Sequence, residues 1–150
     1  MRDTPNSRTL LAQKLVRLLP LVLRSIASHL RERHGILSPG HIGVLKILHN
    51  NPCHLGRLAQ QLEVSAPTIS NTISMFVERG WVRRWRDPSD RRRVLVELTD
   101  EGKATLCELS QTAEEYLVEI LSPLSERDCL QVANDLELLE RIFQKRPPHS

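Results

Sequence analysis

The sequence predicts a mainly α-helical fold with one small β-hairpin. Leucine occurs 25 times in the 150 residues, whereas Trp, Tyr and Phe together account for only five. This composition favours helices packed on helices. Apolar residues recur at helical spacing through most of the chain, while a period of two, typical of a strand with one buried face, marks residues 94–98.

The first predicted helix spans residues 10–33 and has a broad apolar arc. Because such an arc covers more than one surface, the helix should lie between its own lobe and another body. Gly35 ends it, and Ser38-Pro39 supplies an N-cap and a first-turn proline for a second helix. The arc consists of Leu11, Leu15, Leu18, Val22 and Ile26 in one stripe and Leu19, Leu23, Ala27 and Leu30 in the next.

A helix-turn-helix pattern follows. Residues 55–62 predict a short helix, Glu63-Val64 a turn, and Ser65 an N-cap for a helix that runs to about Arg79 and stops at Gly80. The second helix places its apolar residues on one face, which we expect to be buried. These residues are Ile69, Ile73, Phe76 and Val77.

Two short predicted strands, Trp81–Arg86 and residues 94–98, form the hairpin. Between them lie an Asp-Pro-Ser-Asp turn signal and three consecutive arginines, Arg91, Arg92 and Arg93. A hairpin directly after a helix-turn-helix makes the central part a winged helix-turn-helix lobe. An arginine-bearing tip held away from the fold predicts a negatively charged partner.

Two further helices complete the chain. Thr99 caps the first, Ser122-Pro123 breaks it, and Ser125 opens the last. We therefore expect three parts: an N-terminal dimerisation helix (1–34), a winged lobe (35–99) and C-terminal dimerisation helices (100–150). The most economical partner for the apolar stripes of the terminal helices is a second copy, and a two-fold dimer is the commonest closed solution.

The formal net charge is only +3, but it is unevenly distributed. Seven arginines and two aspartates lie between Arg79 and Arg93. A concentrated basic segment of this kind indicates a local contact with a polyanion rather than general stickiness.

The cysteines and apolar runs predict a soluble, cytoplasmic protein. Cys53, Cys107 and Cys129 form no CxxC pair, and no run approaches the roughly 20 apolar residues that span a bilayer. We expect Cys107 and Cys129 to be small buried hydrophobes and Cys53 to lie in a loop. No histidine pair has the spacing of a metal site on one helix face, so no metal or other cofactor is expected.

The chain resembles the MarR family of bacterial and archaeal transcriptional regulators, closely from Leu37 to Leu106. The most specific signature is Asp90-x-Arg92 followed by Leu98-Thr99 and then Glu101-Gly102, behind a helix-turn-helix. The other residues that carry the resemblance are Leu37-Ser38, Val44-Leu45, Leu58-Ala59, Leu62, Val64-Ser65, Pro67-Thr68-Ile69, Gly80, Val82 and Arg84.

The residues themselves also indicate double-stranded DNA as the partner. The N-terminal part of a second helix in this motif meets base edges in the major groove. Here Asn71 can pair with adenine, the Thr68 methyl can pack on thymine, and Ser65 with the helix N-terminus can meet phosphate. The outward residues are Ala66, Pro67, Thr68, Ser70, Asn71 and Ser74.

The resemblance implies that Arg92 enters the minor groove, with Asp90 orienting it or holding the turn. Arg91 and Arg93 would then reach phosphates. This chain departs from the family in having no basic side chain on the second helix before Arg79. The affinity for phosphate is therefore expected to come from the arginines at the hairpin tip and from Arg57, Arg83 and Arg86.

Family relatives bind small aromatic or anionic effectors between the long helices and the winged lobe. The corresponding residues are Arg17, Leu19, Leu23, Ile26, His29, His41, Leu45, Leu48 and Leu109. Arg17 or His29 would be the anion partners. Taken one at a time, each of these residues is expected to be a core contact rather than an effector ligand.

We therefore predict a dimeric repressor that binds palindromic A·T-rich sites and is released by a small effector. No phosphate loop, nucleophile elbow or paired-carboxylate motif indicates an enzyme. Two alternatives stay open: a winged-helix module for protein contacts, and a redox- or metal-responsive regulator.

Overall fold

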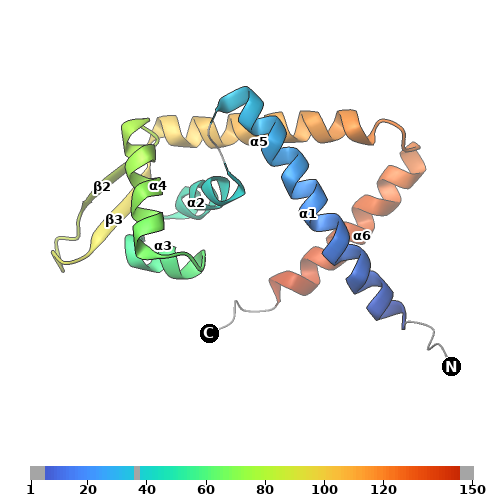
Figure 1. Ribbon diagram of the computed structural model, residues 1–150, viewed down its shortest axis with the longest axis horizontal. Coiled ribbons are helices and arrows are strands. Elements are labelled where there is room, and N and C mark those ends of the chain that lie inside the picture. Colours follow the sequence, from blue (N-terminus) through green and yellow to red (C-terminus); the bar gives the residue numbers. More distant parts are fainter. Residues whose placement is uncertain (1–5, 36–37, 146–150) are drawn as a thin grey trace. The chain divides into compact units, whose positions relative to one another are not determined.

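The computed structural model describes residues 6–35 and 38–145, which form six helices and three strands (Figure 1). The chain consists of two compact units that divide between Ala113 and Glu114. Each unit is described by itself. No helix in the described ranges is both long and apolar enough to cross a membrane.

The first unit begins with α1 (Ser7–His34) and α2 (Pro39–Asn50). Gly35 ends α1 with φ 79°, a left-handed conformation that glycine adopts without strain, and its N–H donates to the Arg31 carbonyl. The Ser38 hydroxyl caps α2 by accepting from the His41 N–H at 3.3 Å. Both predicted helix boundaries are confirmed, although Leu37, which contributes to the family resemblance, lies outside the described residues.

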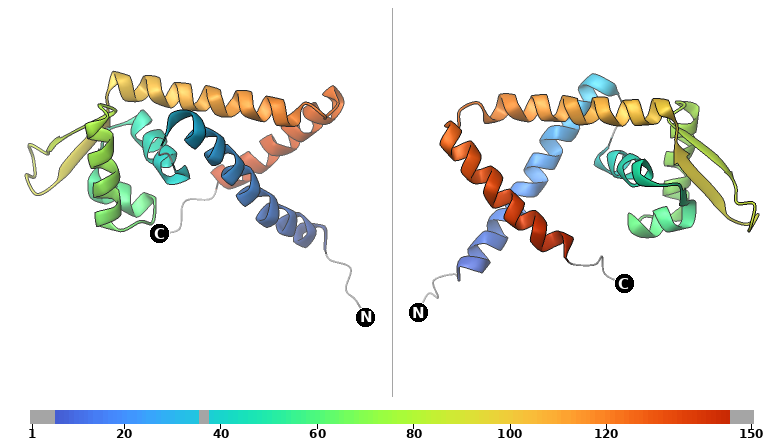
Figure 2. Two further views of the ribbon diagram at one scale, coloured as in Figure 1. Left: turned by 45° about the horizontal axis from the view of Figure 1, so that its top comes forward. Right: turned by 180° about the vertical axis from the view of Figure 1, so that it is seen from behind.

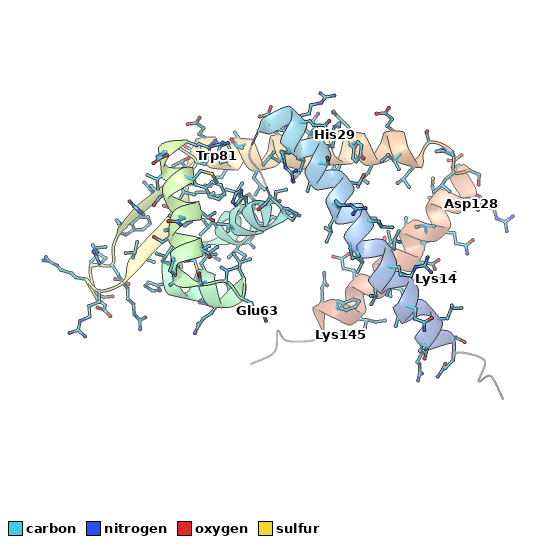
Figure 3. The ribbon with its side chains drawn as sticks, in the orientation of Figure 1. Lys14, His29, Glu63, Trp81, Asp128 and Lys145 are labelled. Atoms are coloured by element: carbon cyan, nitrogen blue, oxygen red, sulfur yellow. The ribbon has the colours of Figure 1, made fainter. Side chains whose placement is uncertain are left out.

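The predicted helix-turn-helix is confirmed as α3 (Leu55–Gln61) and α4 (Ala66–Glu78). The turn places Glu63 at φ 52°, and Figure 3 marks this residue between the two helices. Ser65 caps α4, with its hydroxyl accepting from the Thr68 N–H at 3.2 Å. Ile69, Ile73 and Phe76 are buried as expected, whereas Val77 is only partly buried against the core.

A three-stranded antiparallel sheet has the order β1-β3-β2, with β1 at Cys53–His54, β2 at Val82–Arg86 and β3 at Val94–Leu98. The hairpin of β2 and β3 is as predicted and projects beyond α3 and α4 (Figure 2). Strand β1 corrects the expectation that Cys53 lies in a loop. It pairs Cys53 with Val96 and His54 with Leu95. Two residues are too few for a period of two to be recognised in the sequence.

The core of the first unit lies between α1, α2, α3, α4, the sheet and the start of α5 (Asp100–Leu121). Phe76 of α4 is fully buried, and its ring centroid lies 5.7 Å from that of His41 and 5.5 Å from that of Trp81. Trp81, labelled in Figure 3, sits where α4 passes into β2. This packing fixes the hairpin to the α4 helix.

A compact joint connects the hairpin to α5. The Thr99 hydroxyl donates to the Gly80 carbonyl at 2.5 Å and accepts from the Gly102 N–H at 3.0 Å, so the predicted cap is confirmed. The Thr99 N–H donates to the Trp81 carbonyl at 3.0 Å. Gly102 approaches so closely that a Cβ atom there would lie 2.0 Å from the same carbonyl oxygen.

The second unit contains the C-terminal part of α5 and helix α6 (Glu126–Gln144). The Ser125 hydroxyl caps α6 by accepting from the Asp128 N–H at 3.2 Å. No side chain of α6 is buried. Its exposed large apolar residues are Leu130, Val132, Leu136, Leu138, Ile142 and Phe143.

Candidate DNA interface

The N-terminal half of α4 presents the small polar face that the sequence predicts. Pro67, Thr68 and Asn71 are exposed, together with Ala66 and the capping Ser65. Ser70 and Ser74 are only partly exposed. The Ser65 and Thr68 hydroxyl oxygens lie 2.7 Å apart at the start of the helix. Because α4 carries no bulky exposed side chain here, its backbone can approach a flat partner closely.

The tip of the hairpin is organised by Asp90. Its Oδ1 accepts from the Arg92 N–H at 3.1 Å, and its carbonyl accepts from the Arg93 N–H at 2.9 Å. Its Oδ2 also lies 3.4 Å from Nε of Arg93. Arg91, Arg92 and Arg93 are all exposed. Asp90 therefore fixes the backbone of the loop that carries the three guanidinium groups.

The structure assigns different surroundings to the arginines of β2. Arg83 is paired with Glu97 across the hairpin, with Nε of Arg83 2.8 Å from Oε2 of Glu97. Arg86 donates to the Arg91 carbonyl at 3.2 Å and so braces the tip. Arg84, which sequence reasoning left out of the interface, donates to the Ser74 hydroxyl at 3.2 Å. The sequence feature that could have identified Arg84 is the alternation of side chains along β2, which places Arg83 and Arg84 on opposite faces of the strand.

A groove of about 710 Å³ separates α3 from the tip end of the hairpin and brings Arg57 together with Arg92 and Arg93. His54 lines the same groove, and its Nε2 lies 2.7 Å from Oδ2 of Asp87. Hydrogen bonds from Ser89, followed by the contact with His54, hold the pKa of Asp87 well below its usual range. The groove therefore combines three guanidinium groups with an imidazole that already contacts a carboxylate.

A second cavity, of about 280 Å³, lies between α1, α2 and the first half of α5 within the first unit. Of the residues proposed for an effector, Leu23, Ile26 and Leu109 line it. Lys46 also lines it and was not anticipated. The remaining lining residues are Ala27, Leu30, Pro39, Ile42, Gly43, Ser110 and Ala113.

The other residues proposed for an effector lie elsewhere. Leu45 and Leu48 are core residues, 0% and 2% exposed. His41 lines a separate cavity of about 250 Å³ beside the start of α4. Arg17 and Leu19 are exposed on α1 and His29 is partly exposed, outside the lining of the 280 Å³ cavity. Helical spacing predicts which residues face the interior. It does not distinguish a side chain packed in the core from one that lines a cavity.

The cysteines differ in part from expectation. Cys107 and Cys129 are exposed rather than buried. Cys53 is partly buried, and burial raises the pKa of its thiol in spite of the nearby Arg57. Within residues 6–35 and 38–145, no three His, Cys, Asp or Glu side chains cluster as metal ligands would.

Comparison with known proteins decides the family. Residues 37–94 match the MarR family model. A helix-turn-helix-type transcriptional regulator of Mycobacterium leprae, ML2140, is 32% identical over 129 residues, which cover 83% of this chain and 90% of that protein. The chain belongs to the MarR family.

Two further transcriptional regulators are similar to this chain along nearly its whole length. The uncharacterised regulator YpoP of Bacillus subtilis is 27% identical, with 93% of this chain and 98% of that protein covered. The crystal structure of the transcriptional regulator BldR from Sulfolobus solfataricus has a TM-score of 0.72 at 25% identity, and covers 97% of this chain and 100% of its own. As a MarR-family member the protein is a DNA-binding transcription regulator, not an enzyme, and the winged helix-turn-helix prediction is confirmed.

Proposed function

We propose that this regulator is a dimeric repressor that binds palindromic A·T-rich sites and is released by a small effector. The observation that carries the proposal is a single lobe with two complementary elements: the exposed polar start of α4 and the arginine tip ordered by Asp90. A reading helix and a basic hairpin beside it are the features by which winged proteins engage duplex DNA. Action on chromosomal DNA would place the protein in the cytoplasm.

In this proposal α4 reads bases in the major groove. Asn71 pairs with adenine and Thr68 packs on the thymine methyl, while Ser65 and the helix start meet phosphate. No basic side chain on α4 precedes Arg79. Arg84 compensates in part, because its bond to Ser74 holds a guanidinium beside α4.

The hairpin supplies most of the charge. Arg92 enters the minor groove, where narrow A·T-rich segments attract an inserted guanidinium, and Arg91 and Arg93 contact phosphates. Arg57 adds a contact from α3. Arg83 has its charge partly neutralised by Glu97, so we expect it to contribute less than the arginines of the tip.

The dimer would form through the terminal helices. Apolar side chains that are exposed on α1 and α6 support this arrangement, because a second copy would remove them from water. The corresponding functional division is residues 1–34 and 100–150 for dimerisation and residues 35–99 for DNA binding. A dimer fixes the spacing of two reading helices, which must match half-sites about one helical turn apart.

The cavity between α1, α2 and α5 is the proposed effector site. Its wall is mainly apolar, and Lys46 offers one cation, which suits a small aromatic anion. Such a ligand can weaken DNA binding only through different affinities for the DNA-bound and the released arrangement of the helices.

The proposal is tested by titrating Arg92→Ala and Arg91→Ala proteins against A·T-rich palindromes with swapped flanks at several salt concentrations. Arg92→Ala should weaken binding strongly, remove the advantage of A·T-rich flanks and reduce the salt dependence, since each ionic contact contributes a log–log slope of about −0.9. Arg91→Ala should lower the affinity more evenly across sequences. If Arg92→Ala keeps the parent affinity, salt slope and flank preference, the role given to the hairpin is wrong.

A further inference from the structure

One side-chain contact ties the tip end of the hairpin to the helix-turn-helix. His54 ends β1 directly before α3, and Asp87 directly follows β2. Their 2.7 Å contact joins Nε2 of the imidazole to Oδ2 of the carboxylate. The two side chains are 33% and 13% exposed, so the imidazole stays accessible to solvent protons while the carboxylate is largely covered.

Asp87 is held in its ionised form. Its Oδ1 accepts from the Ser89 N–H at 2.8 Å and from the Ser89 hydroxyl at 2.6 Å. Since these hydrogen bonds lower the pKa of Asp87, the carboxylate accepts throughout the neutral range. His54 must then present an N–H at Nε2, and it can do so as a neutral imidazole or as an imidazolium.

The other charges that line the groove are all positive. Arg57 comes from α3, and Arg92 and Arg93 from the hairpin, whereas β3 contributes uncharged Val94. The only other carboxylate of the hairpin tip, Asp90, is engaged by Arg93 and by the Arg92 N–H. The imidazole of His54 therefore lies among three guanidinium groups and against one carboxylate. A phosphate entering the groove would add a second negative neighbour for the imidazole.

We propose that His54 takes up a proton when a DNA phosphate enters the groove between α3 and the hairpin, so that DNA affinity increases as the pH falls. This inference rests on the proposed DNA-binding mode. Imidazole is the side chain whose charge changes over about pH 5 to 8. In the proposed binding mode, the group that enters the groove is a phosphodiester beside Arg57 and Arg93. The protonated His54 also becomes the stronger hydrogen-bond donor to Asp87, so the same proton steadies the hairpin on α3.

The test compares the parent with His54→Gln at about pH 8 and about pH 6, on one palindromic duplex at fixed salt. Glutamine keeps an N–H donor for Asp87 but cannot gain charge. The parent should bind about fivefold more tightly per half-site at the lower pH, the effect of one unit charge about 4 Å from a phosphate in a water-like medium. His54→Gln should lose most of this gain, so its affinity should change little between the two pH values.

Calorimetry in two buffers of different ionisation enthalpy provides a second readout. The parent should take up protons on binding DNA near neutral pH, and His54→Gln should take up fewer. His49→Gln is the matched control, because His49 is exposed at the end of α2 and does not line the groove, and it should behave as the parent. Asp87→Asn, which removes the carboxylate that favours the imidazolium, should shift the affinity gain to lower pH.

Three outcomes overturn the inference. Equal pH dependence in the parent and His54→Gln assigns the proton to another group. A parent whose affinity and proton uptake do not change with pH also refutes it, while leaving DNA binding intact. A parent that binds no duplex at any pH refutes the proposed function itself. Circular dichroism of each variant separates loss of folding from loss of coupling, and Asp87→Asn gives an independent reading if His54→Gln unfolds.

Discussion

Replacing Gly102 by alanine tests the joint between the hairpin and α5. An added Cβ would lie 2.0 Å from the Trp81 carbonyl oxygen and 2.9 Å from its carbon, whereas Cβ atoms essentially never approach closer than 3.0 Å. The obstacle is backbone, and its oxygen already accepts from the Thr99 N–H. The start of α5 must therefore move by about 1 Å or the hydrogen bond must break.

Two opposing effects set the magnitude. Alanine in place of glycine inside a helix is worth up to about 1 kcal/mol, while overpacking costs about 1–3 kcal/mol. Since backbone cannot swing aside, we expect the cost at its upper end and a net loss of about 2 kcal/mol in unfolding free energy. For a chain of this size that lowers Tm by about 4–8 °C.

Gly56 provides the matched control for this experiment. It lies in the first turn of α3, and a Cβ atom there meets nothing within 4 Å. Gly56→Ala should leave Tm unchanged or slightly higher. Thermal and urea unfolding at one protein concentration measure both variants, because the Tm of an oligomer depends on concentration. A Gly102→Ala protein as stable as Gly56→Ala would refute the close approach.

Four further outcomes are expected. Asn71→Ala should lower the affinity for the best site more than for random DNA in a gel shift, and equal losses would show that Asn71 does not read sequence. Thr99→Val should cost about 1–2 kcal/mol in urea unfolding through loss of the α5 cap, and an unchanged midpoint would contradict that role. Leu136→Asp should dissociate the dimer in sedimentation, whereas the exposed Gln131→Asp should not; a dimeric Leu136→Asp protein would exclude α6 from the interface. Replacing all three cysteines by serine should leave DNA binding unaffected by mild peroxide, as in the parent, and a parent that releases DNA on oxidation would contradict this.

Much of the fold was predictable because its boundaries are set by local chemistry. Ser38, Ser65 and Ser125 cap the N-termini of helices. Gly35 and Gly80, which follow the C-terminal ends of α1 and α4, adopt positive φ. Each of these signals acts within a few residues, so it can be recognised in a single sequence. The buried face of α4 follows from spacing in the same way.

What the sequence did not reveal depends on contacts between distant segments. The pairing of Cys53 with Val96 and the bond between His54 and Asp87 join residues more than thirty positions apart. The bond of Arg84 to Ser74 likewise needs the angle between β2 and α4, which no local pattern encodes. The walls of the cavity between α1, α2 and α5 were equally hard to predict. Leu23 and Leu45 both lie on apolar helix faces in the sequence, but only Leu23 lines this cavity, whereas Leu45 is packed in the core.

Strand β2 forms an edge of the sheet in the part of the chain that the structure describes, so one row of its backbone groups lacks a neighbouring strand. Such an edge invites pairing with a second molecule and growth into aggregates, and charged side chains suppress it. Three of the five residues of β2 are arginines. Their charge thus protects solubility as well as serving the interface, and variants that neutralise β2 should be judged first by their tendency to aggregate.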